Sequence, residues 1–307
     1  MTVTRDDIQL AARRIDGRVR RTPVLRVSPT LTFKLELLQH VGSFKPRGAF
    51  NRLLVAKEQG KLTGQGVVTA SGGNAGLAGA YAARELGVPA RIFVPVNAPA
   101  AKVARLRTLD ADVVQIGNEY AEAYEAAVAE AGQSGALLLH AYDQPEVVAG
   151  QGTIGLELLE DLGDDFDTVL VAVGGGGLIG GIATALGDRA QVVGIEPELA
   201  PTLAKTLDAG ELVDVQVGGV AADSLGARRF GALAFEAVQA NGVQSVLVTE
   251  DSIVAARNEF WREYQLAVEH GAAVTYAALQ TGAYQPAPGE RVVAVICGAN
   301  TDLSTIG

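Results

Sequence analysis

A single lysine, Lys45, lies in a stretch whose composition could make it chemically reactive. The stretch covers residues 42–51, with the sequence GSFKPRGAFN, and it follows a predicted strand and opens a predicted helix. Pro46 suits a first helical turn, where a backbone N–H has no partner in any case. The positive end of the helix dipole favours the neutral amine of Lys45, and a neutral amine is the form that attacks a carbonyl carbon. Composition alone leaves open the alternative that Lys45 is a solvated surface charge.

Two glycine-rich loops could bind anionic groups. Residues 71–76 (SGGNAG) follow a strand predicted over 66–70, and residues 174–181 (GGGGLIGG) follow an apolar strand predicted over 168–173. Both loops open predicted helices, and small residues at a helix start expose backbone N–H groups that bind phosphate or carboxylate. The alternatives are a flexible turn for the glycine run and a simple helix cap for Asn74.

Together and in this order, the three motifs resemble those of the pyridoxal-phosphate enzymes of fold type II, the tryptophan synthase β-like group. Within that group the chain is similar to the serine/threonine dehydratase and serine racemase branch, from about residue 20 to the C-terminus. The resemblance implies that Lys45 is the catalytic residue and holds the cofactor. The cofactor-binding residues that it implies are Phe44, Lys45, Asn74, Gly174, Gly175, Gly176, Gly177, Glu269 and Cys297. The substrate-binding residues that it implies are Ser71, Gly72, Asn74 and Ala75.

Two of these residues stand near the C-terminus. Cys297 ends the last predicted strand, over 291–296, and in the family this position faces the pyridine nitrogen. A neutral partner there does not force protonation of the nitrogen, which suits β-elimination better than transamination. Without the resemblance, Cys297 could equally be a small buried hydrophobe. Glu269 matches an acidic position near the ring in relatives, although His270 stands where Pro is commoner.

A divalent-cation site is also implied by resemblance. Glu196 and Ala200 match a site of the racemases, where a carboxylate, a backbone carbonyl and waters could hold Mg²⁺ or Ca²⁺. A second acidic residue usually helps there, and Thr202 stands in its place. The three histidines show no ligand spacing, and the single cysteine excludes an internal disulfide and a cysteine-based zinc cluster.

The elements that must position these residues alternate between strand and helix over 66–143, which is typical of a parallel sheet with crossover helices. We therefore expect an α/β fold with two open parallel-sheet domains and the cofactor between them. The small substrate-loop domain is predicted over 66–143, and the large cofactor-binding domain over 1–65 and 144–307. Ligands of such sheets bind at the carboxyl ends of the strands, where all three loops lie.

Several elements outside the motifs are also predicted. The pattern favours a helix over 4–20, a strand over 32–37, a helix over 251–269 and a further helix over 272–280. Residues 211–228 show little periodicity, and we expect them to be irregular.

Composition limits the partners. The 307 residues are 48% hydrophobic, which is enough for a sizeable core, and the net charge of -10 argues against nucleic acid and anionic membrane surfaces. No N-terminal apolar run resembles a signal peptide, and no apolar run reaches the length that spans a membrane. We expect a cytoplasmic homodimer that binds a small amino-acid substrate.

The function that these expectations favour is pyridoxal-phosphate-dependent β-elimination of L-threonine or L-serine to a 2-oxo acid and ammonia. The alternatives are a serine racemase, a 3-hydroxyaspartate dehydratase and a non-enzymatic amino-acid-binding α/β protein. A nucleotide-binding oxidoreductase is less favoured, because the glycine run lacks the G-x-G-x-x-G spacing. In the racemases a serine follows the serine that begins the asparagine loop and is the second proton donor. Gly72 stands at that place, so we expect slow racemisation.

Overall fold

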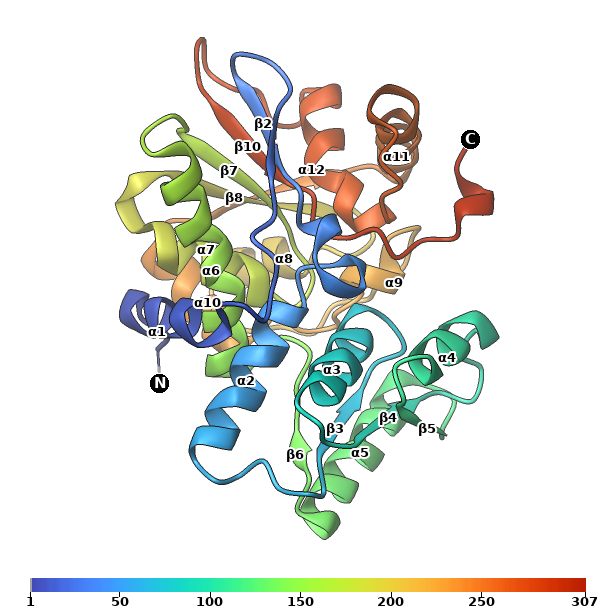
Figure 1. Ribbon diagram of the computed structural model, residues 1–307. Coiled ribbons are helices and arrows are strands. Elements are labelled where there is room, and N and C mark those ends of the chain that lie inside the picture. The colour runs from blue at the N-terminus through green and yellow to red at the C-terminus, as the bar shows by residue number, and fades with distance from the viewer. Residues whose placement is uncertain (1) are drawn as a thin grey trace.

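The larger of two β-sheets in the computed structural model, which describes residues 2–307, has six strands (Figure 1). In spatial order these are β1 (Val24–Arg26), β2 (Leu31–Lys34), β10 (Val292–Val295), β7 (Thr168–Ala172), β8 (Gln191–Pro197) and β9 (Gln244–Val248). All neighbours pair in parallel except β1, which adds an antiparallel strand at one edge.

The second sheet has four strands, all parallel. In spatial order they are β5 (Asp112–Gln115), β4 (Ala90–Val94), β3 (Val67–Ala70) and β6 (Leu137–Leu138). The predicted α/β fold with two parallel sheets is thus confirmed. All four strands fall within 66–143, the range predicted for the small domain, whose boundaries stay a prediction.

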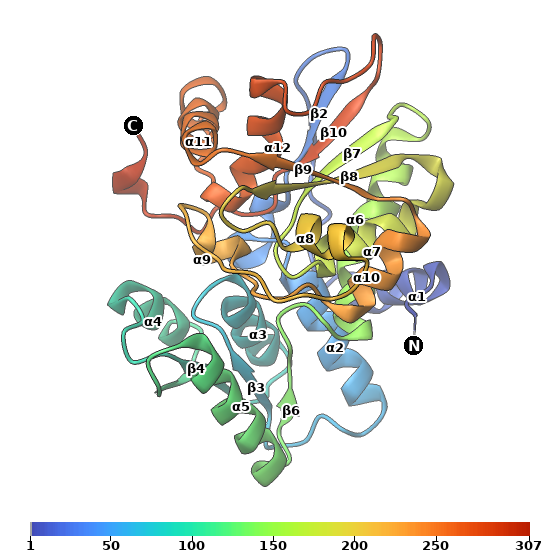
Figure 2. The same cartoon turned by 180° about the vertical axis from the view of Figure 1, so that it is seen from behind.

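Helices cover the sheets on both faces. They are α1 (Arg5–Ile15), α2 (Pro46–Glu58), α3 (Asn74–Glu85), α4 (Ala100–Arg107), α5 (Tyr120–Ser134), α6 (Pro145–Leu162), α7 (Gly177–Leu186), α8 (Thr202–Ala209), α9 (Ala222–Leu225), α10 (Ala232–Ala240), α11 (Glu250–Tyr264) and α12 (His270–Thr281). On the six-stranded sheet, α12 packs against β7 to β10, while α7 contacts β7 and β8 and is backed by α6 and α10. In Figures 1 and 2, the short helix α9 lies between the two sheets, close to α3 and α4.

The burial of the central strand β7 explains why its sequence predicts a strand. All five residues of β7 are buried, as expected of a parallel strand covered on both faces. The helices beside it approach closely: a methyl group on Gly181 of α7 would lie 2.4 Å from the carbonyl oxygen of Val148 of α6. Among residues 2–307, no helix combines the length and the apolarity needed to cross a membrane.

Several predicted boundaries were wrong. The helix predicted over 4–20 ends at Ile15, and the strand predicted over 32–37 ends at Lys34. A short 3₁₀ helix, Glu36–Leu38, follows that strand, and the side chain of its first residue, Glu36, is buried.

The helix predicted over 251–269 is too long at its C-terminal end. It stops at Tyr264 because Gln265 adopts φ 54°, a left-handed conformation. The next helix begins at His270, with Glu269 as its N-cap residue. The short helices α8 and α10 were not predicted, and α9 lies within the range expected to be irregular.

Candidate functional site

Lys45 immediately precedes α2, whose first residue is Pro46, so the predicted position at a helix N-terminus is confirmed. Its Nζ lies 5.0 Å from the centroid of the Phe44 ring and donates a hydrogen bond to the carbonyl oxygen of Ala141 at 2.8 Å. Removal of the amine from water lowers its pKa to about 8. Burial is the main cause of this shift.

Lys45 lines a pocket at the carboxyl ends of β7 and β10. The residues around this pocket are Phe44, Lys45, Asn74, Tyr142, Ala172, Gly174, Gly175, Gly176, Gly177, Leu178, Ser224, Leu225, Glu269 and Cys297. The structure therefore brings together every residue predicted to bind the cofactor, from segments far apart in the sequence. Their individual roles stay predictions.

The glycine run cannot be replaced by larger residues without displacing its neighbours. A methyl group on Gly175 would lie 2.4 Å from the Tyr142 ring, and one on Gly176 would lie 2.5 Å from Phe230. Gly176 also has φ 90°, a conformation that side chains disfavour. Since α7 begins at Gly177 and no side chain caps it, its first backbone N–H groups are free to hold a phosphate. The run thus fits a phosphate-bearing cofactor.

Asn74 faces acidic and amide groups across the pocket. Its Nδ2 donates to both carboxylate oxygens of Glu269, at 2.8 and 3.0 Å, and its Oδ1 accepts from Asn300 Nδ2 at 2.5 Å. Burial raises the pKa of Glu269 to about 7. Gly73, and not Asn74, is the N-cap of α3, so the alternative of a simple helix cap is wrong. The sequence analysis missed Asn300, which follows the last strand closely.

Cys297 is buried just beyond β10, and its Sγ lies 3.9 Å from the carbonyl oxygen of Gly271. Burial raises the pKa of this thiol, which therefore stays neutral near pH 7. The residue lines the pocket, so it can present a neutral group to a ligand as well as pack like a small hydrophobe.

The predicted substrate loop lies at a neighbouring cleft. Gly72 lines this cleft, which shares Asn74, Ser224 and Glu269 with the pocket around Lys45. The Oγ of Ser71, the first residue of the loop, accepts the backbone N–H of Gly73 at 3.2 Å.

Two residues of the predicted loop line neither cavity. They are Ser71 and Ala75. Their predicted contact with a substrate stays a prediction.

Glu196 has partners within the protein. Its carboxylate accepts the backbone N–H groups of Leu203 and Ala204, at 2.6 and 2.8 Å, and the hydroxyl of Ser245 at 2.7 Å. The carbonyl oxygen of Ala200 accepts a backbone N–H at 3.0 Å. No group of three or more His, Cys, Asp or Glu residues within 2–307 could hold a metal ion. These contacts give the predicted Mg²⁺ or Ca²⁺ site no support.

Five residues that line the pocket were not predicted as site residues: Tyr142, Ala172, Leu178, Ser224 and Leu225. Tyr142 could have been found, because it follows the end of β6, where ligands of parallel sheets bind. Ser224 and Leu225 belong to α9, in a stretch whose sequence shows no periodicity, and no signal pointed to them.

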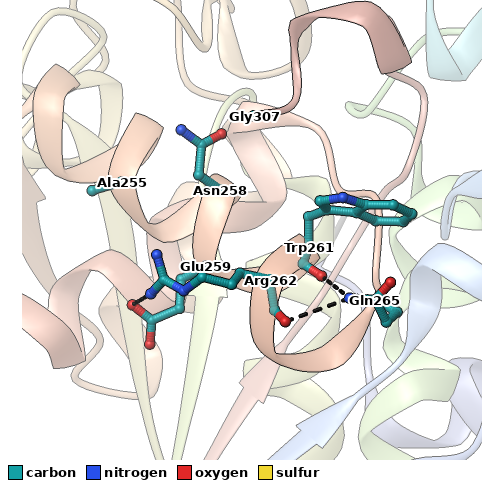
Figure 3. Close-up of a pocket in the computed structure, with 7 residues that line it drawn as sticks. All are labelled: Ala255, Asn258, Glu259, Trp261, Arg262, Gln265 and Gly307. Carbon is teal, nitrogen blue, oxygen red and sulfur yellow. Dashed lines mark hydrogen bonds and ion pairs between the residues drawn. The ribbon is translucent and has the colours of Figure 1, made fainter.

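A separate pocket lies on α11, away from these residues (Figure 3). It is lined by Ala255, Asn258, Glu259, Trp261, Arg262, Gln265 and Gly307. Arg262 pairs with Glu259 at 3.5 Å, and Gln265 Nε2 bonds the carbonyl oxygen of Trp261 at 2.7 Å. These polar groups are engaged with one another, and none of the motif residues lies here.

The chain is similar to known proteins in both sequence and structure. Residues 15–298 match the protein-family model described as "Pyridoxal-phosphate dependent enzyme". A curated relative, the L-threonine ammonia-lyase of Geobacter sulfurreducens, is 38% identical, over 97% of this chain and 76% of that protein. The structure of maize serine racemase superposes with a TM-score of 0.91 at 30% identity, covering 99% of this chain and 96% of the other. The processed form of threonine deaminase isoform 2 from Solanum lycopersicum superposes with a TM-score of 0.87 at 29% identity, covering 99% and 88%.

Proposed function

The chain belongs to the family of pyridoxal-phosphate dependent enzymes, and from this premise we propose that it is an L-threonine or L-serine ammonia-lyase. It removes the β-hydroxyl group and the amino group of its substrate to give a 2-oxo acid and ammonia. Pyridoxal phosphate, when bound, withdraws electrons from the substrate and makes its Cα proton acidic. The observation that carries the proposal is the meeting of Lys45, the Gly174–Gly177 run and Cys297 in one pocket.

Each residue has a proposed task. Lys45 holds the cofactor through its ε-amine and then takes the Cα proton, a role supported by a pKa of about 8 that leaves part of the amine neutral near pH 7. The glycine run binds the phosphate, and Phe44 packs on the ring. The neutral thiol of Cys297 faces the pyridine nitrogen and leaves it without a proton.

The substrate carboxylate has its own proposed partners. The loop that begins at Ser71, with Gly72, Asn74 and Ala75, binds it through backbone N–H groups, and Asn74 also bonds the ring oxygen. The Asn74 amide must then exchange its contacts with Glu269, whose pKa of about 7 allows the carboxyl to titrate in the working range.

Domain boundaries, assembly and location are also proposed. We propose the domain division at residues 66 and 143, a homodimer and a cytoplasmic location. Binding of Mg²⁺ or Ca²⁺ at Glu196 has the least support, because that carboxylate already accepts three hydrogen bonds.

The test is a comparison of L-threonine, L-serine and 3-hydroxyaspartate with the cofactor-loaded protein. Release of 2-oxo acid and ammonia is measured for each, and chiral chromatography follows the remaining serine. Faster turnover of threonine or serine than of 3-hydroxyaspartate supports the proposal. Racemisation of serine as fast as elimination would contradict it and favour the racemase alternative.

The pKa of Lys45 predicts how cofactor capture depends on pH. Because the neutral amine attacks the cofactor's carbonyl carbon, the capture rate by cofactor-free protein should rise about tenfold per pH unit up to about pH 8 and then level off. Rapid-mixing absorbance measurements check this. A rate that kept rising to about pH 10 would instead indicate a lysine with an ordinary pKa.

Gly72 predicts the balance between elimination and racemisation. Glycine has no proton to return to the second face of Cα, so the Gly72→Ser variant should raise racemisation relative to elimination, by about tenfold or more. Gly72 does not have a positive φ. A methyl group there would contact only Val94, at 3.6 Å, so a serine side chain fits. Chiral chromatography with parallel 2-oxo acid measurement gives the ratio. An unchanged ratio would mean that another group returns the proton.

A further inference from the structure

The segment between β6 and α6, residues 139–144, crosses from the small sheet to the large one (Figures 1 and 2). Its Tyr142 lines the pocket around Lys45. Its residues contact different parts of the site. The carbonyl oxygen of Ala141 accepts the hydrogen bond from Lys45 Nζ at 2.8 Å. The ring of Tyr142 covers Gly175 so closely that a methyl group there would lie 2.4 Å from it.

The same segment also holds the start of α10. The hydroxyl of Tyr142 donates to the carbonyl oxygen of Arg229 at 3.2 Å. The carboxylate of Asp143 accepts the backbone N–H groups of Ala232 and Leu233, the first two residues of α10, both at 3.1 Å. A change in the shape of the segment would therefore alter its contacts with Lys45, with the glycine run and with α10 at the same time.

His140 makes three hydrogen bonds within this segment. Its Nδ1 accepts the backbone N–H of Tyr142 at 3.3 Å and that of Asp143 at 2.9 Å, while its own backbone N–H donates to Gln144 Oε1 at 3.0 Å. Because Nδ1 accepts, it carries no proton, and the neutral ring bears its proton on Nε2. An asparagine can make the same turn, because its side-chain oxygen also accepts N–H groups two and three residues ahead.

The surroundings of His140 favour the neutral ring. The ring packs edge-on against Tyr124 of α5, at 5.6 Å between centroids, and against Tyr142 at 4.7 Å. Burial lowers its pKa, and the positive charge of Lys45 acts in the same direction, while the carboxylate of Asp143 opposes it. A protonated Nδ1 would donate instead of accept, and both hydrogen bonds to the segment would be lost.

We propose that His140 is a positioning residue for the cofactor: its unprotonated Nδ1 holds residues 139–144 in the shape that places Ala141 on Lys45 and Tyr142 on the glycine run. Acid weakens cofactor binding through this residue, in addition to its effect on Lys45. The inference depends on the cofactor that the family uses, and not on the substrate proposed above.

The test compares two variants whose side chains branch alike at Cγ. His140→Asn keeps an acceptor near the position of Nδ1, whereas His140→Leu removes it. The dissociation constant of pyridoxal phosphate is measured by absorbance titration of cofactor-free protein at about pH 8 and at steps down to about pH 4.5, well below the usual histidine pKa, because burial lowers the pKa of His140. Circular dichroism of each protein checks that it is folded.

We expect His140→Leu to weaken cofactor binding at least about tenfold at the higher pH, and His140→Asn less than about threefold, since only the first loses both hydrogen bonds. Acid should weaken binding less in His140→Asn than in the wild type, because Lys45 titrates in both but His140 only in one. If His140→Leu does not fold, this difference in pH dependence still tests the proposal. Equal pH dependence in the wild type and His140→Asn, or wild-type affinity in a folded His140→Leu, would overturn it. A wild type that bound no cofactor would instead overturn the proposed function.

Discussion

The Lys45→Ala variant is expected to lose the absorbance band of lysine-bound cofactor and at least about a thousandfold of its turnover, since it loses both the covalent link and the proton-transfer group. The protein should still fold, because Lys45 precedes the first residue of α2 and makes one hydrogen bond, to Ala141. Absorbance after addition of pyridoxal phosphate and release of 2-oxo acid from threonine are the two measurements.

Lys57 offers the matched control. It is an exposed lysine in the last turn of the same helix, far from the pocket residues, and Lys57→Ala should keep both the absorbance band and the turnover. A Lys45→Ala protein that produced 2-oxo acid at the wild-type rate would show that another group holds the cofactor.

The sequence was sufficient where a local rule set the structure. Residues 169–173, which include most of the buried strand β7, are all apolar, and the glycines that follow mark a helix start, so the carboxyl end of this strand could be located. Pro46 likewise predicts the start of a helix, α2, and therefore the position of Lys45 at that start. These positions need no knowledge of distant contacts.

Other features depended on tertiary contacts that leave no local pattern. Gln265 ends α11 in a left-handed conformation that glycine or asparagine usually signals, so the helix predicted over 251–269 runs past its observed end at Tyr264. The pairing of Asn300 with Asn74 joins residues 226 positions apart. Ser224 reaches the pocket from a helix of four residues, which is too short to show periodicity.

The main structural feature that the sequence did not predict is a buried network of charged residues near the start of α2. Arg47 lies within the lysine motif, and its side chain is fully buried and bonds Glu36 through two nitrogens, at 2.7 and 2.8 Å. It also bonds both carboxylate oxygens of Glu157 of α6, at 2.7 and 2.9 Å. Lys34, at the end of β2, joins the network through Glu157 at 2.6 Å. The network thus ties the start of α2 to β2 and α6.

Removing Arg47 should therefore cost far more than removing an exposed arginine. In Arg47→Met the carboxylate of Glu36 stays buried without its cation, and loss of one partner of a buried ion pair costs about 3–5 kcal/mol. Arg91→Met is the control, because its pair with Asp112 is half exposed and such pairs contribute less than about 1 kcal/mol. Urea unfolding of both cofactor-free variants measures the two losses.

A second substitution separates unpaired charge from lost packing. Neutralising the stranded carboxylate, in the double variant Arg47→Met with Glu36→Gln, should recover part of the free energy of unfolding, because the cost of burying a charge without a partner disappears. A defect of packing alone would not be repaired by an amide of the same shape as the carboxylate. If the double variant is no more stable than Arg47→Met, the network holds the start of α2 by shape and hydrogen-bond number rather than by charge.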